Sequence, residues 1–128
     1  MRLLLDIHVL LWWISDDPRI GSHRQSLLRD RSNHVLVSIV SPWEIVIKVQ
    51  VAKLAADVRE ILDGLEQDGF NCLGISVAHL VAPTNLPRHH KDPFDHLLIA
   101  QATAENATLT SEDRWMPSYP VPIVSCSA

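Results

Sequence analysis

The segment LLLDIHVLLWWI at residues 3–14 decides the fold of this 128-residue chain. Its three leucines at residues 3–5 form an apolar run without polar alternation, which is typical of a strand buried on both faces of a parallel sheet. The run ends at Asp6, and apolar residues then recur at helical spacing over residues 9–13. The segment therefore predicts a buried strand, a carboxylate at its end and a helix directly after it.

The same order of strand and helix recurs along the chain. HVLVSI at residues 34–39 is rich in β-branched residues and predicts a second strand, and a helix is expected after it through about Val51. Strands that alternate with helices favour right-handed crossovers and a parallel sheet covered by helices on both faces, which is an α/β fold. The other predicted elements are helices over residues 25–30, 57–67 and 92–104, short strands over residues 72–75, 108–111 and 121–124, and a loop over residues 83–91.

Two of the predicted helices begin with the same arrangement of residues. SPWE at residues 41–44 has the order of an N-cap serine, a proline at the first helical position and an acid at the third position of a capping box. DPFD at residues 92–95 repeats this order with Asp92 as the N-cap. Each segment therefore predicts an acidic side chain in the first turn of a helix.

The composition describes an ordinary globular protein. With 128 residues, 47% of them hydrophobic, the chain is long enough for one well-packed core, so a single domain over residues 1–128 is expected. A formal net charge of −4 argues against a broad cationic surface that holds nucleic acid through phosphate contacts. The sequence has no bilayer-length apolar run, no signal-peptide pattern and no CxxC pair, so a cytoplasmic protein is expected.

Four acids are expected to meet at one edge of the predicted sheet. Asp6 ends the first strand, Asp113 follows the strand near residue 109, and Glu44 and Asp95 stand in the first turns of helices. Ligands of open α/β sheets bind beyond the carboxyl ends of the strands. Carboxylates gathered there repel one another unless cations neutralise them, and Mg²⁺ or Mn²⁺ suits an all-oxygen site. Such ions activate water and stabilise the leaving oxygen of a phosphodiester, so the pattern predicts metal-dependent hydrolysis.

Each acid also has a structural interpretation. Glu44 completes the capping box or pairs with Lys48 one turn later, and Asp95 suits the positive end of a helix dipole. Asp113 is equally an ordinary loop acid, and its neighbour Glu112 competes for the same role. Asp6 is the hardest to explain structurally, because an ionisable group at the end of a buried strand is costly without a partner.

Four segments together resemble the VapC-type toxins, which are the PIN-domain ribonucleases of type II toxin–antitoxin systems. They are LLLDIHVLLWWISDDPRI, SIVSPWEIVIK, HHKDPFDHLLIAQA and TLTSEDRWMPSYPVPIV, and they cover nearly the whole chain. The resemblance implies a three-layer α/β/α fold around a central, mostly parallel sheet, dependence on Mg²⁺ or Mn²⁺, and cleavage of RNA, often transfer or ribosomal RNA. It also implies a homodimer and a cognate antitoxin whose C-terminal segment enters the acidic cleft.

The resemblance carries residue by residue onto the four acids, with two departures nearby. The first three metal ligands fall on Asp6, Glu44 and Asp95, and the fourth falls on Asp113 when counted back from the final strand, or on Glu112 when counted forward from Thr110. The residue after the first acid is usually threonine or serine, but here it is Ile7, which has no hydroxyl. The residue after Asp95 is often arginine or lysine, but here it is His96.

Two other classes of protein with an aspartate after the first strand need acidic residues that this chain lacks. Aspartyl-phosphate phosphatases need a second aspartate two residues after the first, where this chain has His8. Receiver domains need an aspartate at the end of the third strand, where this chain has Ile75 and Ser76. The remaining alternative is a PIN-like module that binds RNA or a partner protein with little or no hydrolysis, and Ile7 favours it.

Overall fold

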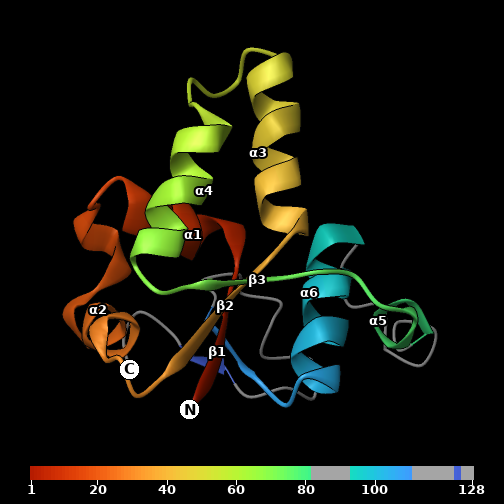
Figure 1. The fold of residues 1–128 in the computed structure, drawn as a ribbon. Coiled ribbons are helices and arrows are strands. Elements are labelled where there is room, and N and C mark those ends of the chain that lie inside the picture. Colours follow the sequence, from red (N-terminus) through yellow and green to blue (C-terminus); the bar gives the residue numbers. More distant parts are fainter. Residues whose placement is uncertain (82–92, 111–122, 125–128) are drawn as a thin grey trace.

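A five-stranded parallel sheet forms the centre of the molecule in the computed structural model, which describes residues 1–81, 93–110 and 123–124. The strands stand in the order β3-β2-β1-β4-β5, and every neighbouring pair is parallel (Figure 1). The prediction of an α/β fold with a mostly parallel sheet is therefore confirmed. The strands are β1 (Arg2–Leu5), β2 (His34–Ser38), β3 (Asn71–Leu73), β4 (Thr108–Thr110) and β5 (Ile123–Val124).

Helices cover both faces of this sheet. Figure 1 shows α1, α2 and α4 on one side of the strands and α5 and α6 on the other, with α3 leading away from the end of β2. The helices are α1 (Ile7–Ile14), the 3₁₀ turn η1 (Pro18–Ile20), α2 (Ser22–Arg29), α3 (Val40–Gln50), α4 (Val58–Gln67), α5 (Val77–Val81) and α6 (Pro93–Ala104).

The central strand β1 divides its side chains between two apolar cores. Leu3 and Leu5 pack into the cluster that includes residues of α1, α2, α3 and α4. Leu4 packs into the opposite cluster, which contains Leu98 and Ile99 of α6. All three leucines of β1 have no solvent exposure. The uninterrupted apolar run in the sequence is thus explained, because both faces of the strand are covered.

The start of α3 corrects the prediction that Ser41 caps this helix. The helix begins at Val40 with Ile39 at the N-cap position, and no side chain makes a capping hydrogen bond there. Ser38 takes part instead, because its hydroxyl oxygen accepts a hydrogen bond of 3.2 Å from the backbone N–H of Val40. β2 runs into α3 almost without a loop, so Ser41 already lies inside the helix, and Glu44 stands in the second turn rather than the first.

Other element boundaries differ from the predictions by a few residues. α2 begins at Ser22, three residues earlier than expected, and β3 ends at Leu73 rather than at residue 75. The short elements η1 and α5 were not predicted, because five residues or fewer carry too little periodicity to identify a helix. The predicted loop over residues 83–91, Asp92 and Cys126 lie outside the described residues.

The carboxyl ends of the central strands meet at one edge of the sheet. The backbone N–H of Asp6, directly after β1, donates to the carbonyl oxygen of Thr110 at the end of β4, at 3.0 Å. At the same edge, between β2 and β3, the N–H of Ile39 directly after β2 donates to the carbonyl oxygen of Leu73 at 2.9 Å. These bonds fix where α1 and α3 begin. In the described part of the chain, none of the helices has both the length and the apolar character to cross a membrane.

Candidate active site

Asp6 is buried at the junction between β1 and α1. Its side chain is 2% exposed, and one carboxylate oxygen accepts a hydrogen bond of 2.9 Å from the backbone N–H of Val9. Asp6 is therefore the N-cap of α1, which gives this carboxylate a structural role in addition to any chemical one. The same bond holds the carboxylate at the carboxyl edge of the sheet.

Glu44 and Lys48 lie one turn apart on α3. The Lys48 ammonium nitrogen is 3.4 Å from one carboxylate oxygen of Glu44, so the ion pair that the sequence suggested is present. The Glu44 side chain is 14% exposed and the Lys48 side chain 38% exposed, so the acid is the more enclosed partner. A lysine ammonium therefore accompanies one of the predicted metal ligands.

Asp95 is the third residue of α6, in the first turn of that helix. Its neighbour Phe94 packs edge to face against Trp43 of α3, with ring centroids 5.6 Å apart. Such aromatic pairs stabilise the contact between the two elements that carry them. This contact brings the start of α6 alongside the part of α3 that carries Glu44.

A cavity of about 400 Å³ lies where α1, α3 and α6 meet, and it contains two of the predicted acids. Glu44 and Asp95 both line it, whereas Asp6 is buried and does not line it, although the next residue, Ile7, does. The structure thus brings two of the four predicted acids, Glu44 and Asp95, to one cavity. We call this space the carboxylate cavity; its walls are formed by Ile7, His8, Glu44, Ile47, Lys48, Pro93, Phe94 and Asp95.

The carboxylate cavity has a donor set that fits a hard divalent cation. Mg²⁺ commonly binds through one or two carboxylates and keeps several of its water ligands. Glu44 and Asp95 meet that requirement from opposite helices. Across residues 1–81 and 93–110, no group of three or more His, Cys, Asp or Glu side chains gathers as a ligand cluster. Asp113 and its competitor Glu112 lie outside the described residues.

Both departures from the family pattern, Ile7 and His96, lie next to a predicted metal ligand. Ile7 is 6% exposed and forms part of the cavity wall, so this wall is apolar where a hydroxyl is usual. His96 follows Asp95 on α6, is 9% exposed and is not among the residues that line the cavity. The cationic side chain that lines the cavity is Lys48, which the sequence indicated only as a structural partner of Glu44.

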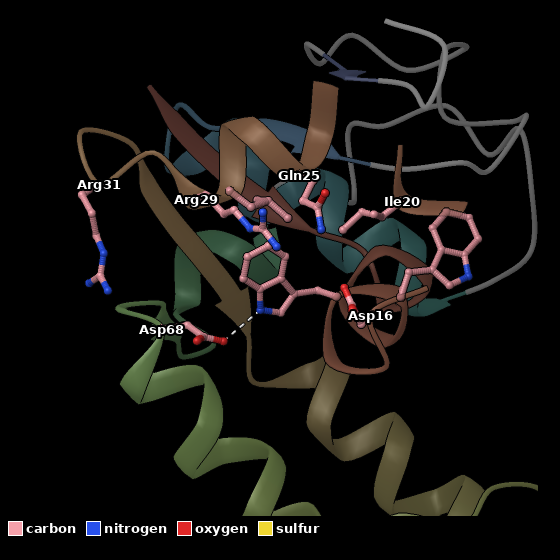
Figure 2. Close-up of a pocket in the computed structure, with 9 residues that line it drawn as sticks. Asp16, Ile20, Gln25, Arg29, Arg31 and Asp68 are labelled. Atoms are coloured by element: carbon pink, nitrogen blue, oxygen red, sulfur yellow. Dashed lines mark hydrogen bonds between the residues drawn. The ribbon is translucent and has the colours of Figure 1, made fainter. Parts of the chain in front are cut away.

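A second cavity, of about 310 Å³, lies near the opposite end of α1. There the indole N–H of Trp13 donates to a carboxylate oxygen of Asp68 at 2.9 Å, as Figure 2 shows. Arg29, Gln25 and Ile20 border the same space. None of the four predicted acids lines it. The two cavities are therefore separate, and the candidate chemistry belongs to the first.

Solved structures of toxin–antitoxin complexes share this fold. The VapBC2 complex of Rickettsia felis bound to a DNA fragment from its promoter is similar over 98% of this chain and 98% of its own, with 18% identity and a TM-score of 0.74. For the DNA-bound VapBC of Salmonella typhimurium the identity is 15% over 98% of both chains, with a TM-score of 0.69. For VapBC-1 of nontypeable Haemophilus influenzae it is 13% over 100% of both chains, with a TM-score of 0.67.

At these low identities the structural similarity shows a common fold only. The family is assigned from the sequence match instead. Among curated proteins, none matches this sequence. The sequence profile of the PIN domain matches residues 3–120, which includes both β1 with Asp6 and the start of α6 with Asp95. Because this match spans nearly the whole chain, the chain belongs to the PIN domain family.

Proposed function

We propose that this protein is a metal-dependent endoribonuclease of the VapC toxin type, which hydrolyses phosphodiester bonds of RNA and is neutralised by a cognate antitoxin. PIN domains are typically nucleases that use a divalent metal. The observation that carries the proposal is the convergence of Glu44 and Asp95 on one cavity at the carboxyl edge of the sheet. Residues 1–128 are proposed to act as one domain.

The proposed ligands of Mg²⁺ or Mn²⁺ are the four acids identified in the sequence. Glu44 and Asp95 would bind directly from α3 and α6, and Asp6 would contribute from the end of β1, where its N-cap bond already orients it. Asp113, or Glu112 in its place, is the proposed fourth ligand. The bound ion would supply an activated water and positive charge for the phosphate oxygens. Ile7, Ile47 and Phe94 would limit access of bulk water to the reacting phosphate.

The partners follow from the same proposal. The structural neighbours are named as toxin–antitoxin complexes, which supports a cognate antitoxin as a partner. We propose that this antitoxin covers the carboxylate cavity. Transfer or ribosomal RNA is the proposed substrate class, and a homodimer is the proposed assembly. The cytoplasm is the proposed place of action, because RNA and antitoxin would both meet the protein there.

An RNA cleavage assay tests the enzymatic activity. Bulk transfer and ribosomal RNA are incubated with the purified chain in Mg²⁺, in Mn²⁺ and in excess chelator, and the products are resolved on a denaturing gel. The chain is expected to cut RNA only with metal, and Asp95→Asn and Glu44→Gln are each expected to lower the rate by at least about a hundredfold. Asp63→Asn is the matched control, because Asp63 is exposed on α4.

The buried Ile7 in the cavity wall favours a second candidate, a PIN-like module that binds RNA or a partner protein without cutting. The same assay separates the two. Cleavage that needs metal and disappears in the Asp95 and Glu44 variants supports the ribonuclease. RNA binding without metal-dependent cleavage supports the module, and equal cleavage by all variants indicates a contaminating nuclease.

A further inference from the structure

Lys48 occupies an unusual position for a lysine of an amphipathic helix. It lines the carboxylate cavity together with Glu44 and Asp95, and its ammonium nitrogen lies 3.4 Å from Glu44. An ion pair on an open helix face contributes little, because water screens both charges. Here the acid is only 14% exposed, so the ammonium stands against a carboxylate that is largely enclosed. Lys48 therefore offsets one of the two negative charges on the cavity wall.

We propose that Lys48 is an exchangeable counter-cation. In the metal-free protein it neutralises Glu44, and when Glu44 binds a divalent ion, Lys48 leaves the carboxylate and contacts an RNA phosphate in the same cavity. This inference rests on the proposed ribonuclease function, and it assigns a task to a residue outside the four acids.

In the metal-free protein, the positive charge of Lys48 is expected to hold it against the Glu44 carboxylate. An ammonium beside a metal ligand competes with the ion for the same carboxylate and repels the ion as well. A unit positive charge within about 6 Å of a divalent ion weakens its binding on the order of tenfold, even at the dielectric constant of water. Lys48 therefore lowers the metal affinity of the cavity, which keeps Glu44 paired until metal arrives.

The proposed contact with RNA is possible because the lysine side chain is flexible. Lysine carries a compact charge on a flexible four-carbon stem, so its ammonium reaches a new partner without movement of the helix. Lys48 is 38% exposed, so its stem is not locked by packing. The chain has a net charge of −4, and a cationic group at the cavity wall offers a local contact for an anionic polymer.

Two measurements on the full chain test the exchange. Mn²⁺ is titrated calorimetrically into the protein without RNA, and binding of labelled bulk transfer RNA is measured in Ca²⁺ over a range of NaCl concentrations, with RNA integrity checked on gels. The proteins compared are the wild type, Lys48→Met, Lys48→Arg, Glu44→Gln and the control Lys53→Met. Lys53 is exposed beyond the end of α3 and does not line the carboxylate cavity.

Lys48→Met is expected to bind Mn²⁺ about tenfold more tightly. It is also expected to bind RNA more weakly, with a salt-dependence slope smaller by about 1, which corresponds to one lost phosphate contact. Lys48→Arg and Lys53→Met are expected to resemble the wild type in both measurements. A Lys48 ammonium that stays on Glu44 and never contacts RNA predicts no change in the salt slope.

The outcomes separate this inference from the function on which it rests. If the wild type binds Mn²⁺ and Glu44→Gln weakens that binding, while Lys48→Met leaves the affinity or the salt slope unchanged, the exchange is overturned and the ribonuclease proposal stands. If the Glu44→Gln protein binds Mn²⁺ as tightly as the wild type does, the assignment of the metal site is wrong, and the proposed role of Lys48 is wrong with it.

Discussion

The imidazole of His79 on α5 lies 3.1 Å from the carboxylate of Glu105 at the end of α6. The other ring nitrogen, Nδ1, accepts a hydrogen bond of 3.0 Å from the backbone N–H of Ser76. With Nδ1 as an acceptor, Nε2 is the ring nitrogen that donates to Glu105. Arg2 of β1 pairs with the same carboxylate at 3.2 Å, so one small polar network joins α5, α6 and the central strand.

His79→Ala is expected to destabilise the protein by about 2 kcal/mol, because it removes a buried hydrogen-bonded side chain and leaves a gap between α5 and α6. Urea denaturation followed by circular dichroism measures the change. His23→Ala is the control, since His23 is exposed on α2 and its loss is expected to change stability by less than about 0.5 kcal/mol. Equal effects of the two substitutions would contradict the role of the His79 network.

Asp6 allows its structural and chemical roles to be separated. Asparagine caps helices about as well as aspartate does, so Asp6→Asn is expected to keep the stability of the wild type within about 0.5 kcal/mol. Asp6→Ala removes the bond to the Val9 N–H and is expected to cost about 1 kcal/mol. Both variants are expected to lose RNA cleavage. An active Asp6→Asn protein would show that this carboxylate serves the helix and not the reaction.

Ile99 tests the second apolar core. It has no solvent exposure and packs on α6 against the β1 and β2 side chains of that face. Ile99→Ala is expected to cost about 3 kcal/mol, because it removes apolar contacts and leaves a cavity between helix and sheet. Ile14→Ala, at a side chain 38% exposed, is the control and is expected to cost much less. Denaturant midpoints of the two variants check the difference.

The ion pair of Asp17 is expected to make the free energy of unfolding depend on pH. The Arg19 side chain, and then its backbone N–H, donate to this carboxylate and hold the pKa of Asp17 below its usual value. Since the folded pKa is lower than the unfolded one, the stabilisation is complete above pH about 4 and is lost as the pH falls through the folded pKa. The destabilisation by Asp17→Asn is therefore expected to be largest near neutrality and to shrink in acid.

Denaturation midpoints across a pH series measure this effect. Asp63→Asn, at an exposed position of α4, removes an equal charge and serves as the control. A difference between Asp17→Asn and the wild type that stays constant from neutral pH down to strongly acidic pH would refute the linkage.

The sequence predicted the fold well wherever burial acts on a continuous pattern. The leucines of β1 and the β-branched run of β2 are apolar because both faces of each strand are covered, so their sequences identify them. The start of α3 was predicted wrongly, because Ser41 and Pro42 have the local preferences of a helix start but are buried where β2 leads straight into the helix. Packing of the sheet edge overrode the local signal.

The sequence led to two acids that line the carboxylate cavity, but it did not identify the other residues of the cavity wall. Glu44 and Asp95 could be paired from sequence, because parallel strands bring the following helices to one edge. The position of Lys48 in the cavity could not, since it depends on how α6 packs against α3 through Phe94 and Trp43. That Asp6 does not line the cavity could not be predicted from spacing along the chain either.

The central position of β1 in the sheet also determines how much of the chain must be present before the sheet can be completed. β1 comes from residues 2–5, yet one of its two neighbours, β4, comes from residues 108–110, and the Thr110 hydroxyl donates to the Leu4 carbonyl across 106 positions. A nascent or truncated chain that ends before α6 lacks both Asp95 and the strand that holds the backbone of Asp6. Premature termination of translation is therefore expected to give fragments in which the proposed metal site is incomplete.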